Sequence, residues 1–95
     1  MTAYVVVDIK VTDPETYQRY IEVAPSTIEH FGGRYIARGG TAEKLEGAWE
    51  PNRVVVLEFE SVDQAKAWWS SEEYRGPKAL RQGASHANMI VVQGL

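Results

Sequence analysis

The sequence predicts one α+β domain in which two helices cover one face of a four-stranded sheet, and three observations support this fold class. The chain has 95 residues, enough for one domain but not for two. Four short runs are rich in valine, isoleucine and aromatic residues, as strands are. Two segments between them carry apolar residues at helical spacing. The resulting order, β-α-β-β-α-β, is that of a ferredoxin-like fold with an antiparallel or mixed sheet.

The first half of the chain contains two strands and the helix between them. We expect a strand over Ala3–Val11 and a helix that begins at Pro14, where Asp13 can cap free backbone N–H groups. Gly32-Gly33 should end this helix, and Arg34–Arg38 should form the second strand. The apolar positions of the helix, which should pack against the sheet, are Tyr17, Ile21, Ala24, Ile28 and Phe31.

The second half of the chain repeats the pattern of strand, helix and strand. A connector over residues 41–51 leads to a third strand at Arg53–Phe59. Ser61 and Gln64 have the spacing of a capping box, which predicts the start of a second helix. Gly76-Pro77 should interrupt this helix. The remaining predicted elements are a further turn or two of helix at Lys78–Gln82 and a last strand at Ala87–Gln93.

Two acidic side chains are the first candidates for a catalytic site. Right-handed crossovers place the first and third strands at the centre of the sheet, where we expect them to be adjacent and parallel. Asp8 and Glu58 should then lie near one another on the face away from the helices. Two neighbouring carboxylates repel, so one could take a raised pKa and act as a general base. Salt bridges to Arg34 or Lys10 are the alternative.

His86 is the third predicted catalytic residue. It begins the last strand, which should run antiparallel to the first and bring the imidazole to the end that carries Asp8. A histidine beside a carboxylate can move a proton at neutral pH. A surface histidine at the entry to a strand is the alternative.

The predicted ligand-binding residues are two arginines and two aromatic residues. Arg38 and Arg53 should meet across the second and third strands, at the end of the sheet opposite to the acidic pair, where two guanidinium groups can hold a carboxylate or phosphate. Trp68 and Tyr74 could line a flat organic ligand. Arg81 is a further cationic candidate. The alternatives are ion pairs with nearby glutamates and burial of the aromatic rings in the core.

The second face of the sheet predicts a homodimer. Two helices cover one face only, and a sheet with its other face in water should alternate apolar and polar residues. Val5–Val7, Val54–Leu57 and Met89–Val92 are apolar on both faces. The same face of a second copy is the simplest partner. A lone domain that leaves one valine patch exposed is the alternative.

Composition excludes several other classes of function. The net charge of −3 and calculated pI of about 5.3 argue against a nucleic-acid partner. There is no cysteine, so thiolate chemistry is excluded. The histidines lack the spacing of a metal site, and no phosphate loop or nucleophile elbow occurs, so we predict no metal and no cofactor. The absence of a signal-peptide pattern and of a long apolar run predicts a cytoplasmic protein without a membrane partner.

Several short motifs resemble a domain family of unknown function, DUF1330. In the first half they are Asp13-Pro14-Glu15-x-Tyr17, Phe31-Gly32-Gly33-Arg34-Tyr35, Arg38-Gly39-Gly40 and Leu45-Glu46-Gly47. In the second half they are Leu57-Glu58-Phe59, Ala65-x-x-Trp68, Glu73-Tyr74 and Ala79-Leu80-Arg81-x-Gly83-Ala84. The resemblance implies a dimeric α+β barrel, whose relatives include cofactor-free monooxygenases, isomerases and small-ligand-binding domains. It implies no particular substrate.

Three functions therefore remain open from the sequence. The first is a cofactor-free enzyme that oxidises a small organic substrate or moves a proton on it. The second is a binding or sensing domain for a small anionic or aromatic ligand, and the third is a dimeric interaction module. An open, polar-lined space between sheet and helices favours the first two, whereas a filled space favours the third.

Overall fold

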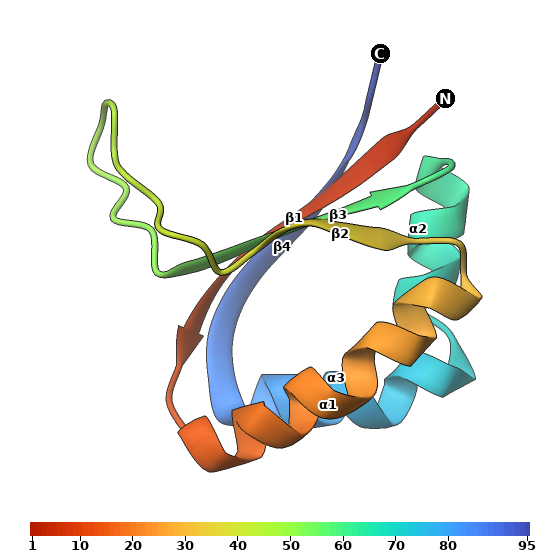
Figure 1. Ribbon diagram of the computed structural model, residues 1–95, viewed down its shortest axis with the longest axis horizontal. Helices are drawn as coiled ribbons and strands as arrows, with labels where there is room; N and C mark the ends of the chain where they lie inside the picture. Colours follow the sequence, from red (N-terminus) through yellow and green to blue (C-terminus); the bar gives the residue numbers. More distant parts are fainter.

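The computed structural model describes residues 1–95 as a four-stranded sheet with three helices on one face (Figure 1). In chain order the elements are β1 Ala3–Val11, α1 Pro14–His30, β2 Arg34–Arg38, β3 Arg53–Phe59, α2 Val62–Trp69, α3 Glu72–Ala84 and β4 Ser85–Gln93. The predicted α+β fold is confirmed, although β4 begins earlier than expected and the second helical region is divided into α2 and α3. None of the helices has the length and apolar character needed to cross a membrane.

The strand order β2-β3-β1-β4 is the predicted one, but the predicted direction of β3 is wrong. β3 runs antiparallel to β1, as do all neighbouring pairs in the sheet. The α1 crossover leaves β1 and β2 pointing the same way, and the direct connection from β2 then reverses β3. This register sets Asp8 opposite Val54 and Glu58 opposite Tyr4, four residues apart along β1.

Two polar side chains start α1 and α2 where the sequence predicts. The Asp13 carboxylate accepts hydrogen bonds from the hydroxyl and the backbone N–H of Thr16, at 2.7 and 3.3 Å. Both hydrogen bonds lower the pKa of Asp13, and the one from the hydroxyl has the larger effect. The backbone N–H of Gln64 donates to the Ser61 hydroxyl over 3.0 Å. Each cap satisfies a backbone donor that the first turn of a helix leaves free.

The break in the second helical region lies before Ser71, so the predicted interruption at Gly76-Pro77 is wrong. α3 continues through both of these residues. Ser71 caps α3 by accepting a hydrogen bond from the Tyr74 N–H at 3.1 Å, and two glutamates occupy the first turn, where the helix dipole favours them. This start signal outweighs the single backbone hydrogen bond that proline removes. Tyr74 and Arg81, two turns apart, therefore share one face of one helix.

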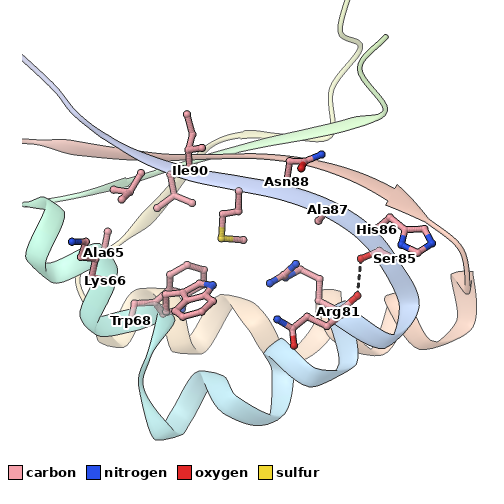
Figure 2. Close-up of a pocket in the computed structure, with 14 residues that line it drawn as sticks. Ala65, Lys66, Trp68, Arg81, Ser85, His86, Ala87, Asn88 and Ile90 are labelled. Carbon is pink, nitrogen blue, oxygen red and sulfur yellow. Dashed lines mark hydrogen bonds between the residues drawn. The ribbon is translucent and has the colours of Figure 1, made fainter. Parts of the chain in front are cut away.

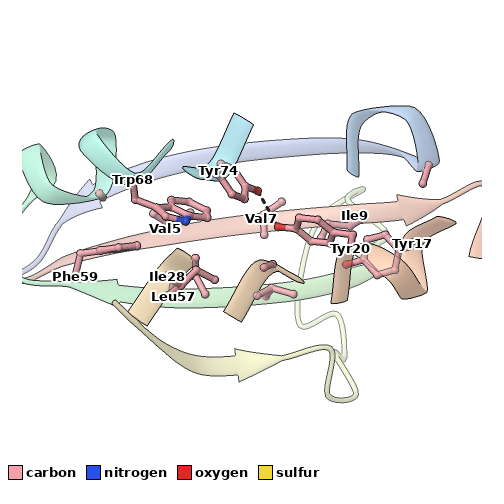
Figure 3. Close-up of a cluster of buried hydrophobic side chains, with 14 residues drawn as sticks. Val5, Val7, Ile9, Tyr17, Tyr20, Ile28, Leu57, Phe59, Trp68 and Tyr74 are labelled. Atoms are coloured by element: carbon pink, nitrogen blue, oxygen red, sulfur yellow. Dashed lines mark hydrogen bonds between the residues drawn. The ribbon is translucent and has the colours of Figure 1, made fainter. Parts of the chain in front are cut away.

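The hydrophobic core lies between the sheet and all three helices (Figure 3). It is a cluster of fourteen buried residues, of which the largest and most enclosed are Trp68, Tyr74, Phe59 and Ile28. Tyr17 and Ile28 of α1 are buried as predicted, whereas Ile21 and Phe31 are only partly buried. Phe31 follows the last turn of α1, so part of its ring lies beyond the sheet–helix contact. Tyr20 takes a buried place instead.

The outer face of the sheet, turned away from the helices, has an apolar centre. A cross-strand row runs from Val56 through Val6 to Ile90, which is 62% exposed. The next row runs from Glu58 through Tyr4 to Val92. A monomer therefore leaves apolar side chains of three strands in contact with water.

Candidate functional site

A pocket of about 600 Å³ opens between β4 and the helices α2 and α3 (Figure 2). Eight of its fourteen lining residues are hydrophobic. Lining residues come from both faces of β4, an edge strand, so the pocket opens past this edge of the sheet. The crevice beside α1 holds only about 20 Å³. The space between the sheet and α1 is thus filled, whereas a space remains open between the edge strand β4 and the helices α2 and α3.

Arg81 is the charged group that extends from α3 into this pocket (Figure 2). The residue is only 5% exposed, and none of the four ion pairs in the structure includes it. Its Nε donates a hydrogen bond to the Tyr74 hydroxyl at 3.3 Å. A buried charge without a counter-charge is costly, by several kcal/mol after relaxation. The pocket therefore contains a cation that an anionic ligand would neutralise.

A chain of hydroxyl groups supports Arg81 from the core side. The Tyr74 hydroxyl, which accepts the hydrogen bond from Arg81, lies 2.7 Å from the Tyr20 hydroxyl (Figure 3). The Tyr74 ring packs on Trp68 with 4.1 Å between ring centroids. Both aromatic rings are fully buried, so they fix the direction in which the guanidinium points.

The same hydroxyl chain predicts a loss of stability in alkali. Burial, followed by the neighbouring Tyr74, raises the pKa of Tyr20 above its usual value of 10.0. Below pH 10 both folded and unfolded chains keep this proton, and above it the unfolded chain alone releases it. Stability should fall by up to about 1.4 kcal/mol per pH unit above about pH 10. Urea melts of Tyr20→Phe should show a shallower fall than wild type, and equal slopes would contradict this assignment.

The two neighbouring tryptophans divide between core and pocket rim. Trp68 is 1% exposed and its Nε1 donates to the Thr27 hydroxyl over 3.1 Å, yet one side of its ring lines the pocket. Trp69 also lines the pocket and is partly exposed. Lys78 lies 3.7 Å above the Trp69 ring. Trp68 and Tyr74 thus act first as core residues, and through that role they shape one wall of the pocket.

The predicted pairing of Asp8 with Glu58 is wrong, because the antiparallel register separates them. Each carboxylate has its own partners. Asp8 accepts hydrogen bonds from the Trp49 Nε1 and the Asn52 backbone N–H, both at 2.8 Å. Glu58 accepts one from the Arg34 Nε at 2.9 Å. Both face away from the pocket, on the outer face, and the salt-bridge alternative holds for Glu58.

His86 lies where the sequence places it, near the end of β1 that carries Asp8. It pairs with Lys10, while Asp8 pairs with Asn88, two residues further along β4. The two side chains make no hydrogen bond to each other, and both carboxylate oxygens of Asp8 accept hydrogen bonds from the 49–52 segment. His86 alternates with the inward-facing Ser85 and Ala87, so it is exposed on the outer face and borders the pocket at the edge of β4. A catalytic role for His86 stays a prediction.

Arg38 and Arg53 both border the narrow crevice beside α1, apart from the larger pocket. They lie at the same end of the sheet as Asp8, not the opposite end, since Ile9 pairs with Arg53. Arg38 donates to the Ile21 carbonyl at 3.2 Å, and its guanidinium lies 4.3 Å from the centroid of a neighbouring tyrosine ring. The buried Nε of Arg53 has no partner. Their predicted ion pairs with glutamates do not form.

Sequence reasoning noticed Arg81 as a cation but did not place it in the site. The signal was its spacing of seven residues from Tyr74, which puts both side chains on one helix face. The expected break at Gly76-Pro77 hid this relation. Residues of β4 that complete the lining, such as Met89, follow from their inward phase on the edge strand. No group of three His, Asp or Glu side chains is close enough to hold a metal ion.

Comparison with known sequences supports the family resemblance. The family model described as "Domain of unknown function (DUF1330)" matches residues 2–95. The chain belongs to the DUF1330 family. No curated protein matches this DUF1330 domain.

Solved structures with low identity share the fold of this DUF1330 domain. The RPA0582 protein of unknown function from Rhodopseudomonas palustris is 19% identical, with a TM-score of 0.81, over 99% of this chain and 82% of that one. A dimeric ferredoxin-like protein of unknown function from Jannaschia sp. CCS1 is 8% identical, with a TM-score of 0.73, over 99% and 100%. SnoaB, a cofactor-independent oxygenase from Streptomyces nogalater, is also 8% identical, with a TM-score of 0.68, over 99% and 93%.

Proposed function

We propose that the pocket binds a small organic anion, a carboxylate on a flat or apolar body, with Arg81 as its anchor. The observation that carries this proposal is the burial of Arg81 beside an open pocket without any acidic partner. Its Nε already donates to Tyr74, so the two terminal nitrogens are available for a ligand. A guanidinium binds a carboxylate with two parallel hydrogen bonds, which supplies both energy and orientation.

The walls of the pocket favour an apolar body on this anion. Its volume of about 600 Å³ is in the range of sites for small organic molecules. Trp68, Trp69 and Met89 offer flat or polarisable surfaces, and a ring packed on them would leave water. Gln82 adds an uncharged polar group at the rim that can select among ligands. An inorganic anion would meet Arg81 but leave these surfaces unused.

Catalysis on the bound anion is the second candidate function. The fold likeness to a cofactor-independent oxygenase and the presence of His86 in the lining support it. A ligand that Arg81 holds and that extends past the edge strand β4 would come within reach of His86, whose imidazole could remove a proton from it. The enzyme would then need both residues, whereas a binding or sensing domain would need Arg81 alone.

We further propose that the protein is a homodimer joined through the outer face. The partly exposed row of Val6, Val56 and Ile90 supports this, as do neighbours described as dimeric ferredoxin-like proteins. A face-to-face pair would bury more than about 1,200 Å² in total, as stable interfaces do. The same face on both copies makes the contact two-fold symmetric.

Ligand binding is tested with matched acids and amides. Benzoate should raise the melting temperature and shift pocket resonances in NMR, whereas benzamide, which has the same ring without the charge, should do neither. At a hundredfold excess over the dissociation constant, the expected stabilisation is about 2.7 kcal/mol. Equal effects of the two compounds, or no effect of any aryl or alkyl carboxylate, would reject the anion-binding function.

A further inference from the structure

The connection between β2 and β3, residues 39–52, forms an arm without helix or strand. It projects from the sheet on the side opposite to the helices, as the yellow-to-green loop in Figure 1 shows. Gly39, whose φ is 71°, turns the chain out of β2, and a Cβ there would collide with the Arg53 guanidinium. The arm and the outer face together therefore form an L-shaped surface.

Specific contacts hold the arm against the outer face. The Asp8 carboxylate, which belongs to that face, accepts hydrogen bonds from the Trp49 Nε1 and the Asn52 N–H, both at 2.8 Å. Lys44 and Glu50 form an ion pair across the arm. These contacts give the arm a defined position in the single chain, so the arm is preorganised for binding before any partner is present.

Two large apolar side chains on the arm have no cover within the chain. Leu45 is 99% exposed and Trp49 is 61% exposed. The Trp49 ring is tied by its nitrogen to Asp8, so its apolar surface continues that of the outer face. Apolar groups displayed on a positioned segment beside an apolar sheet face are typical of a protein–protein contact.

We propose that the arm clasps a second copy of this chain, with Leu45 and Trp49 packed on the partner subunit while the two outer faces meet. The inference rests on the proposed dimer and identifies what completes its interface. A second copy offers the same apolar face and an identical arm, so two arms close two symmetric contacts. The arm itself carries three glutamates and one lysine, a charge that disfavours anionic membranes and nucleic acids as the occupant.

Sedimentation equilibrium of four variants beside wild type tests the clasp. The double variant Leu45→Asp, Trp49→Ser should raise the dimer dissociation constant about tenfold or more, because both side chains would leave the interface. Val6→Asp should give monomer. Trp69→Ser, a partly exposed tryptophan on the helix side, should leave the dissociation constant unchanged. Leu45→Asp alone should act in the same direction as the double variant, and its site is fully exposed, so folding does not depend on it.

The outcomes separate the clasp from the dimer. The clasp is overturned, and the dimer kept, if Val6→Asp dissociates the wild-type dimer while the arm variants leave the dimer dissociation constant unchanged. A wild type that stays monomeric at micromolar concentration overturns both. A second measurement needs no disruptive variant. Wild type is labelled with 5-fluorotryptophan, and the ¹⁹F NMR signal of Trp49 is assigned by its absence in Trp49→Phe. This signal should shift when dilution converts dimer into monomer. An unchanged Trp49 signal while the dimer dissociates also overturns the clasp.

Discussion

Phe59→Ala should lower the free energy of unfolding by about 3–5 kcal/mol. Phe59 is 1% exposed at the end of β3, where its ring packs on Trp68 with 5.5 Å between centroids. A Cβ added to Gly33 would come within 2.5 Å of the same ring, so the chain already encloses it on that side. Removal of the ring would leave a cavity that close neighbours cannot fill. Urea denaturation followed by tryptophan fluorescence measures the loss.

Phe31→Ala is the matched control for this loss. Phe31 is partly buried after the end of α1, so the same substitution should cost about 1–2 kcal/mol. Equal losses of unfolding free energy at the two positions would mean that the C-terminal end of α1 belongs to the core as much as β3 does. That result would contradict the packing described above.

Arg81→Met should weaken carboxylate binding and at the same time preserve or raise stability. Loss of charged hydrogen bonds worth about 1.5–3 kcal/mol should weaken benzoate binding about ten- to a hundredfold. Methionine has no charge to bury, so the unfolding free energy should stay equal or rise by about 1–2 kcal/mol. This combination is expected where a buried charge is kept for a ligand rather than for folding.

Arg75→Met is the control for this substitution, on the same helix. Arg75 is exposed and pairs with Glu72, so the change should leave both binding and stability nearly as they are. A marked loss of stability in Arg81→Met would show that Arg81 supports the fold through Tyr74. In that case the absence of an acidic partner would not be a signal of ligand binding.

Much of the fold could be predicted because local signals agree with the tertiary structure. Asp13 and Ser61 cap their helices, and the strand bounds follow from valine-rich runs. The sequence does not predict the break before Ser71, because Gly76-Pro77 is a stronger signal for a helix break than a single serine cap. The direction of β3 was predicted wrongly although topology dictates it. Its reversal follows from a helical crossover and then a direct connection, not from any residue type.

The site was harder to predict because it depends on distances between elements. Asp8 and Glu58 are conspicuous in apolar strands, yet each has a structural partner that lies far away in the sequence. The motif that contains Arg81 implies no role for it, and its importance comes from what the fold leaves out, an acidic side chain within reach. Such an absence becomes visible only when all neighbours are in place.

The central claim is that the Arg81 guanidinium itself meets the ligand, and the ¹⁵N–¹H signal of its Nε tests this most directly. Arg81→Met assigns the signal, and Arg75 serves as an internal control in the same spectrum. On addition of benzoate we predict a saturable shift of the Arg81 signal, none for Arg75, and none for either with benzamide. An Arg81 signal that stays unmoved while benzoate shifts other resonances would contradict the claim, because the ligand would then bind elsewhere.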